Sequence, residues 1–241
     1  PEAQFRPGED VRVGEEGRMR RVQVFDVNET LLDLAAMDPH FQRVFGDAGM
    51  RRAWFGEMIQ SALVATITGA YRQFGEHAMA ALEMVADQAG IELTDDDRGA
   101  IGGQMRELPA HPEVPDALRR LRDEGFRMAA LTNSTLEVAR AQLEHAGLIE
   151  LFDEVLSADT VRRLKPAPEP YRMVAERFGV GIGELRLIAA HAWDVAGARH
   201  AGCAAAFVAR PGKALDPLAE PPDVVGRDLA EVAERIAATD R

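Results

Sequence analysis

Short apolar runs that alternate with amphipathic stretches dominate the chain from residue 21 to its end. Such runs, about four to eight residues long and bounded by polar turns, are typical of strands buried in a parallel sheet. They cover 21–25, 127–131, 154–157, 185–190, 205–209 and the VVG run at 224–226. Helical periodicity separates them over 115–124, 135–146, 168–178, 194–201 and 228–237. Strands that alternate with helices predict an α/β fold built on a doubly wound parallel sheet.

A long helical stretch interrupts this alternation after the first strand. Apolar residues recur every three to four positions between residues 50 and 89, and Gly90 ends that pattern. A further short helix is expected after Asp95, before a proline-rich connector. We therefore expect a small helical cap. The predicted divisions are a flexible polar leader at 1–18, a core formed by 19–36 and 109–241, and a cap at 37–108.

Composition and charge narrow the function classes. The formal net charge is −12 over 241 residues, which argues against a general nucleic-acid binder because such a protein needs a basic face. Cys203 is the only cysteine, so an internal disulfide is impossible. No apolar run approaches the ~20 residues of a membrane span. We expect a soluble cytoplasmic protein that contacts neither nucleic acid nor membrane.

Polar clusters follow several of the predicted strands at the point where each strand ends. Ligands of open α/β sheets bind at the carboxyl ends of the strands, so these clusters are expected to converge. They are Asp26–Thr30, Thr132–Ser134, the loop that carries Lys165, and His191–Asp194. Lys165 and Lys213 are the only lysines of the chain, which makes a lysine in such a loop a candidate for chemistry.

Four motifs in these clusters resemble those of the haloacid dehalogenase superfamily, and more narrowly its L-2-haloacid dehalogenase branch. They are FDVNETLLD (25–33), LTNST (131–135), KPAPEPY (165–171) and AWDVAGAR (192–199). The resemblance covers roughly residues 20–240. It implies a Rossmann-like core with a cap inserted after the first strand, and a homodimer.

The resemblance also implies roles for individual residues. Asp26 would be a nucleophile that forms an ester intermediate, and Lys165 would hold its carboxylate ionised. Thr132 and Asn133 would bind the substrate carboxylate or the departing halide, and Tyr171 would join the same hydrogen-bond network. The alternatives are a loop or capping aspartate at Asp26 and a packed tyrosine at the start of its helix.

Asn28 bears on the type of reaction. Phosphatases of this superfamily carry an aspartate two residues after the nucleophile, and that aspartate protonates a poor alkoxide leaving group. An amide cannot donate that proton, whereas a halide leaves as a stable anion without one. The fourth motif also offers only Asp194 as an acidic residue, which is a thin supply of oxygen ligands for Mg²⁺. We expect an enzyme that uses no metal and no other cofactor.

Two positions depart together from the pattern of many relatives. Glu29 stands where those relatives have glycine, and His191 stands where they have asparagine. We hypothesise that Glu29 orients His191 and that His191 activates the water that hydrolyses the ester on Asp26. Asp194 would then position Lys165. The alternative is an exposed Glu29 beside a structural core histidine.

The cap is expected to close over the substrate with an apolar wall. The residues of that wall are Phe55, Ile59, Phe74 and Trp193. Phe55 occupies the position where the family carries an arginine thought to receive the halide, so the halide site is in doubt. Arg52, one turn earlier, is a candidate replacement, with an ordinary exposed arginine as the alternative. The other histidines are interpreted as surface or incidental residues.

These observations together predict a hydrolase that acts on short (S)-2-haloalkanoic acids through an ester on Asp26 and yields (R)-2-hydroxy acids and halide. A Mg²⁺-dependent small-molecule phosphatase of the same superfamily is one alternative. A binding module without turnover on the same fold is another. The halogen, the chain length and the native substrate are not determined by the sequence.

Overall fold

The computed structural model describes residues 20–240, so the predicted leader at 1–18 lies outside the described residues. Six parallel strands form one sheet in the order β3-β2-β1-β4-β5-β6. Their bounds are β1 Val22–Phe25, β2 Met128–Thr132, β3 Glu154–Ser157, β4 Leu185–Ala189, β5 Ala204–Val208 and β6 Val224–Gly226. The predicted doubly wound parallel sheet is confirmed, with strand boundaries displaced by at most one residue.

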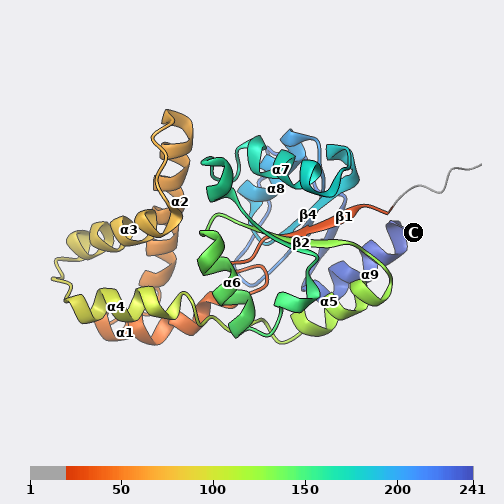
Figure 1. Ribbon diagram of the computed structural model, residues 1–241. Coiled ribbons are helices and arrows are strands. Elements are labelled where there is room, and N and C mark those ends of the chain that lie inside the picture. Colours follow the sequence, from red (N-terminus) through yellow and green to blue (C-terminus); the bar gives the residue numbers. More distant parts are fainter. Residues whose placement is uncertain (1–19, 241) are drawn as a thin grey trace, which may run out of the picture.

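Helices cover both faces of the sheet (Figure 1). One face carries α5 (Val114–Asp123), α6 (Leu136–His145) and α9 (Leu229–Thr239), and the other carries α7 (Pro168–Phe178) and α8 (Ala192–Ala201). The side chains of β1 alternate between these layers, because successive residues of a strand point to opposite faces. Val22 and Val24 pack under α7 and α8, whereas Phe25 packs in the other layer.

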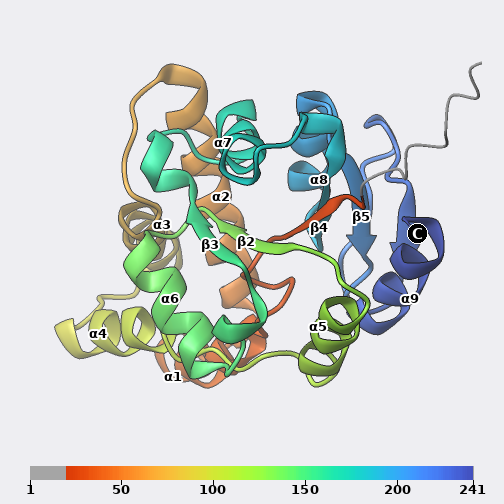
Figure 2. The ribbon, with the colours of Figure 1, turned by 45° about the vertical axis from the view of Figure 1, so that its right-hand side comes forward.

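Four helices between β1 and α5 form a lobe beside the sheet, which stands apart in Figure 1 and overlaps α6 and β3 in the turned view of Figure 2. They are α1 (Asp38–Phe45), α2 (Met50–Thr68), α3 (Phe74–Ala89) and α4 (Asp95–Gln104). The expected helical stretch at 50–89 is two helices, because Gly69 adopts φ 71° and ends α2. The prediction of a small helical cap inserted after the first strand is therefore confirmed.

Short 3₁₀ segments complete the secondary structure at Leu34–Met37, Ile149–Leu151, Ala158–Val161 and Ile182–Glu184. Within residues 20–240, no helix is long and apolar enough to cross a membrane. The strand order reverses beside β1: the chain proceeds from β1 to β2 and β3, then returns to place β4 on the other side of β1. Crevices for ligands form at the carboxyl ends of strands at such a reversal.

One close approach fixes the loop that carries Lys165 against α8. A Cβ atom added at Gly197 would lie 2.3 Å from Cβ and 2.7 Å from the carbonyl oxygen of Pro166. Only a glycine therefore lets α8 approach the residue that follows Lys165. This contact sets the distance between the Lys165 loop and the helix that carries Asp194.

We expect Gly197→Ala to lower the free energy of unfolding by about 1–3 kcal/mol, the usual cost of overpacking a core. Gly56→Ala in α2 is the matched control, because a Cβ atom there meets no atom within 4 Å. That variant should be stabilised by about 0.5–1 kcal/mol, since alanine is the better helix former. Urea unfolding of both variants measures the difference. Equal effects would contradict the tight contact.

Candidate active site

The candidate site lies where the segments that follow β1, β2 and β4 meet the loop after β3. Asp26 follows β1 directly, and β1 pairs with β4 so that Phe25 lies opposite Ile188. His191 begins α8 just beyond β4, and Asp194 lies in the first turn of that helix. The edge of the sheet therefore brings together side chains that are up to 168 residues apart, from Asp26 to Asp194.

Asp26 is buried and accepts hydrogen bonds at both carboxylate oxygens. Lys165 Nζ lies 2.8 Å from Oδ1, whereas Thr30 Oγ1 at 2.6 Å and His191 Nδ1 at 3.1 Å both contact Oδ2. Burial alone would favour the neutral acid. The charges and hydrogen bonds of Lys165 and His191 outweigh that effect and hold the pKa of Asp26 far below its usual range. Asp26 is thus a carboxylate at any pH near neutral.

Thr30 belongs to the predicted cluster after the first strand, but the sequence assigned it no role. Its hydroxyl accepts a hydrogen bond from the backbone N–H of Ala190 at 2.9 Å and donates to Asp26. The signal was its place four residues after Asp26, inside the first motif. Thr30 links the segment after β1 to the end of β4 and fixes the direction in which Asp26 Oδ2 points.

Lys165 is almost completely buried, and its ammonium group has three acceptors. Nζ lies 2.8 Å from Asp26, 2.7 Å from Asp194 Oδ2 and 3.0 Å from the carbonyl oxygen of Leu131. Burial disfavours the charged amine, but the two carboxylates overcome this and raise the pKa of Lys165. Tyr171 donates its hydroxyl to Asp194 Oδ1 at 2.5 Å. The ammonium group of Lys165 is thus held between the carboxylates of Asp26 and Asp194.

Asn133 and Thr132 support the loops that enclose the site. Asn133 Oδ1 accepts the backbone N–H of Lys165 at 2.8 Å, and its Nδ2 donates to the Lys165 carbonyl oxygen at 3.3 Å. Thr132 Oγ1 accepts the backbone N–H of Ser134 at 3.1 Å. The amide of Asn133 thus clamps the backbone on both sides of Lys165, a support that its predicted role at the substrate does not include.

His191 bridges two carboxylates. Its Nδ1 lies 3.1 Å from Asp26 Oδ2 and its Nε2 lies 2.9 Å from Glu29 Oε2. Burial favours the neutral ring, but the hydrogen bonds and charges of these two partners raise the pKa of His191 above 6.5. Both ring nitrogens then donate, which is the state that two carboxylate acceptors require.

Two aromatic rings enclose His191. The Phe55 ring, from α2 of the cap, lies 5.5 Å from the imidazole with an angle of 18° between the planes. Trp193 lies on the imidazole at 5.2 Å and 22°. Such parallel stacks hold the ring plane and favour its charged form. Phe55 and Trp193 therefore contact the candidate general base itself, which goes beyond the apolar wall that was expected.

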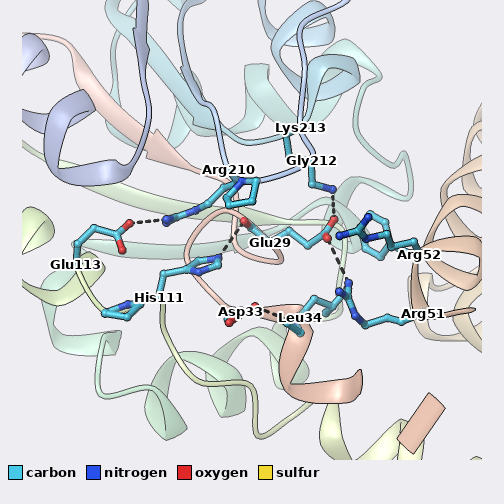
Figure 3. A pocket seen from close by; sticks show the side chains of 14 residues that line it. Glu29, Asp33, Leu34, Arg51, Arg52, His111, Glu113, Arg210, Gly212 and Lys213 are labelled. Carbon is cyan, nitrogen blue, oxygen red and sulfur yellow. Dashed lines mark hydrogen bonds and ion pairs between the residues drawn. The ribbon is translucent and has the colours of Figure 1, made fainter. Parts of the chain in front are cut away.

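Glu29 is not an ordinary exposed residue. Its backbone adopts φ 61°, a region that residues other than glycine rarely enter, and its carboxylate contacts His191, Lys213 and Arg51. Burial opposes its ionisation, but the hydrogen bonds and charges of His191 and Lys213 lower the pKa of Glu29 to about 2. Figure 3 shows Lys213 and Arg51 reaching this carboxylate from opposite sides.

A cavity of about 600 Å³ opens beside Glu29 between the cap and the core (Figure 3). Four basic side chains line it together with three carboxylates and His111; they are Arg51, Arg52, Arg210 and Lys213, and Glu29, Asp33 and Glu113. Arg52, the predicted candidate for the halide, lies exposed at this cavity. Its neighbour Arg51 is buried, with Nε 2.5 Å from Asp38 and Nη1 3.6 Å from Glu29.

The remaining predicted residues divide between the site and its surroundings. Asn28 is buried, and its amide contacts Ser134 at 3.5 Å and Gln142 at 3.0 Å. Phe74 lines a second cavity of about 550 Å³ beside the start of α6, and Ile59 is half-buried in α2. Phe74 is therefore separated from the cavity beside Glu29, which Phe55 does line.

Of the other histidines, interpreted as surface or incidental residues, His77 and His111 are not at the open surface. His77 is buried inside the cap, where Nδ1 lies 2.8 Å from Ser61 Oγ. His111 is half-buried and contacts the carbonyl oxygen of Glu29 at 3.3 Å. In the described part of the chain, no group of three or more His, Cys, Asp or Glu residues is arranged to hold a metal ion.

Known proteins of one enzyme family are similar to this chain over most of its length. The family model for haloacid dehalogenase-like hydrolases matches residues 21–202. The chain is 26% identical over 213 residues to (S)-2-haloacid dehalogenase H-109 of Pseudomonas putida, which covers 88% of this chain and 95% of that protein. It is 28% identical over 222 residues to (S)-2-haloacid dehalogenase 2 of Pseudomonas sp. strain CBS-3, which covers 90% and 97%.

Solved structures agree in fold. The L-2-haloacid dehalogenase RSc1362 superimposes with a TM-score of 0.86 at 26% identity and covers 90% of this chain and 98% of its own. The L-2-haloacid dehalogenase of Xanthobacter autotrophicus, solved with chloropropionic acid covalently bound, gives a TM-score of 0.85 at 24% identity and covers 92% and 100%. The resemblance inferred from the four motifs is confirmed.

We expect Asp26→Asn to lower the pKa of His191, because the variant removes one of the two carboxylates that stabilise the imidazolium. Titration of the histidine ring signals by NMR measures this change. Asp116→Asn, at the exposed start of α5, is the control and should leave the His191 titration unchanged. A pKa of His191 that is equal in Asp26→Asn and wild type would contradict the assigned contact.

Proposed function

The chain belongs to the haloacid dehalogenase-like hydrolases, and we propose that it hydrolyses short (S)-2-haloalkanoic acids to (R)-2-hydroxy acids and halide. The observation that carries this proposal is the state of Asp26: a carboxylate held ionised by Lys165 at the tip of β1. An ionised carboxylate in a buried site is a nucleophile ready for a carbon centre that carries a good leaving group.

In the first step, Asp26 attacks C2 of the substrate from the side opposite the halogen. Oδ2 already accepts from both Thr30 and His191, whereas Oδ1 accepts only from Lys165, so Oδ1 is the oxygen with a free lone pair. A new carbon–oxygen bond forms while the carbon–halogen bond breaks, and the halide leaves with the electron pair. Configuration at C2 inverts once.

The ester changes the state of His191. An ester carries no charge, so His191 loses the stabilisation that the Asp26 carboxylate gave to the imidazolium, and its pKa falls. The ring releases one proton to solvent and becomes a base at Nδ1. Glu29 still accepts the N–H at Nε2 and so fixes the tautomer.

In the second step, His191 Nδ1 takes a proton from water as the water oxygen attacks Cγ of Asp26. Thr30 donates to the oxygen on which negative charge develops. The Cγ–O bond to the substrate then breaks, and the second water proton ends on the product hydroxyl. Asp26 returns as a carboxylate and His191 as an imidazolium. One water is consumed, and one halide and one proton are released in each turnover.

The same geometry supports a small substrate. Phe55 and Trp193 stack on His191, and Ile59 adds apolar surface on α2 of the cap. We propose that Thr132, Asn133 and Asn28 line the end of the site that receives the carboxylate or the halide, and that Arg52 lies at its mouth. We also propose a homodimer, which the family resemblance implies, and a cytoplasmic location.

Asn28 separates this proposal from a phosphatase. The Asn28 amide cannot donate a proton to an alkoxide, and its contacts run to Ser134 and Gln142 instead. A substrate whose leaving group needs no proton fits this site. Carbon–halogen bonds meet that requirement and phosphate esters do not.

The first test is halide release from racemic 2-chloropropionate in excess EDTA. We expect release to stop near half conversion with the (R)-substrate left over, because attack from one side of C2 accepts one enantiomer. Chiral chromatography of the residual acid measures this selectivity. Phosphate release from aryl phosphates that depends on Mg²⁺, with no halide release, would favour the phosphatase instead.

A second test concerns the two steps. A single turnover in ¹⁸O-labelled water should place ¹⁸O in Asp26 and leave the product hydroxyl unlabelled, because that oxygen comes from the carboxylate. His191→Asn should slow hydrolysis of the ester by about 10²–10⁴-fold, the usual contribution of a general base, and let the ester accumulate. Mass spectrometry of the peptide that contains Asp26 detects both results. Full turnover by His191→Asn would sink the water-activating role.

A further inference from the structure

Glu29 is held by cations from both lobes of the molecule. Its Oε2 contacts His191 at 2.9 Å and forms an ion pair with Lys213, and its Oε1 lies 3.6 Å from Arg51 Nη1. Lys213 belongs to the core, in the segment after β5, whereas Arg51 belongs to α2 of the cap. The carboxylate that orients His191 is therefore fixed from two independent elements.

Lys213 is well placed for this task. Its backbone N–H donates to the carbonyl oxygen of Arg210 at 2.9 Å and closes a tight turn that contains Gly212 at φ 80°. Its ammonium group also lies 5.5 Å from the centre of the Phe55 ring, the same ring that stacks on His191. Lys213 thus contacts both neighbours of His191 on this side, the carboxylate and the aromatic ring.

Arg51 is the weaker partner of Glu29. Its guanidinium is closer to Asp38, at 2.5 Å, than to Glu29 at 3.6 Å. Glu29 has a left-handed backbone, and its carboxylate is held by contacts with His191, Lys213 and Arg51. Lys213 supplies the shorter ion pair and hence most of the restraint besides His191.

We propose that Lys213 is a positioning residue for the hydrolysis step, which holds Glu29 against His191 Nε2. This inference rests on the proposed function, because it concerns hydrolysis of the ester on Asp26. It assigns a role to each of the two lysines of the chain. Lys165 serves the carboxylate that attacks, and Lys213 serves the carboxylate that orients the base.

The sign of the pH effect follows from the charges that surround His191. The segment after β1 contributes Asp26 and Glu29, and the loop after β3 contributes Lys165. Arg51 comes from α2, Asp194 from α8 and Lys213 from the segment after β5. In the variant, Arg51 still keeps the Glu29 carboxylate near the ring, so its charge still acts on the imidazolium while the Lys213 cation no longer opposes it. The pKa of His191 in the ester form therefore rises, and hydrolysis then needs a higher pH.

The experiment follows the ester in single turnovers of the full-length enzyme with limiting (S)-2-chloropropionate, quenched and analysed by mass spectrometry across the neutral pH range. In Lys213→Met we expect ester formation within about two-fold of wild type and ester decay about ten-fold slower, with the acidic limb of the decay profile moved to higher pH. Lys213→Arg should restore both the rate and the limb.

Arg199→Met is the matched control. Arg199 has a side-chain exposure of 20%, against 24% for Lys213, and it also pairs with carboxylates, here Glu220 and Asp223. Its ion pairs lie away from Glu29, so its decay profile should match wild type. Loss of stability alone would affect both variants and would not move a pH limb.

The outcomes separate the inference from the proposed function. If the ester in Lys213→Met decays with the wild-type rate and pH dependence, the positioning role is overturned. Formation of that ester would still support the proposed function. An equal defect in Lys213→Met and Lys213→Arg would also overturn it, because the arginine preserves the cation. A wild-type enzyme that forms no ester would overturn the proposed function and the inference together.

Discussion

The ammonium group of Lys165 is the interaction on which the rest of the site depends. It is buried between Asp26 and Asp194, and burial of an unpaired charge costs several kcal/mol. Three separate segments must therefore meet around it: the end of β1, the loop after β3 and the start of α8. Two contacts hold these segments together. Asn133 binds the Lys165 backbone, and Pro166 packs closely against Gly197.

Around this interaction the charges form a matched set. Four carboxylates, Asp26, Glu29, Asp38 and Asp194, face four cations, Lys165, Lys213, Arg51 and the protonated ring of His191. A neutral total lets these groups remain buried together. Any covalent change that neutralises Asp26 leaves one cation in excess, and the imidazolium of His191 can release its proton in response. Formation of an ester on Asp26 would thereby be coupled to loss of a proton from His191, without any movement of the backbone.

The sequence predicted the sheet, its flanking helices and the main strand-tip residues, because these depend on local periodicity and on the alignment of parallel strand ends. It did not single out Arg51, since adjacent positions on a helix point in different directions and the phase of α2 relative to the core is a tertiary property. Lys213 lies 184 positions from Glu29, in a loop without periodicity, so nothing local indicated their ion pair. The left-handed backbone of Glu29 could not be predicted either, because glutamate rarely adopts a positive φ.

The stack of Trp193 on His191 has an optical consequence. An imidazolium accepts an electron from an excited indole far more readily than a neutral imidazole does, so the emission of Trp193 reports the charge of the ring that lies 5.2 Å away. The chain has only one other tryptophan, Trp54, which is buried in the cap with its indole N–H bound to the carbonyl oxygen of Ala78. The protein thus carries a native fluorophore beside its candidate base, and stopped-flow emission can time the proton's departure without any label.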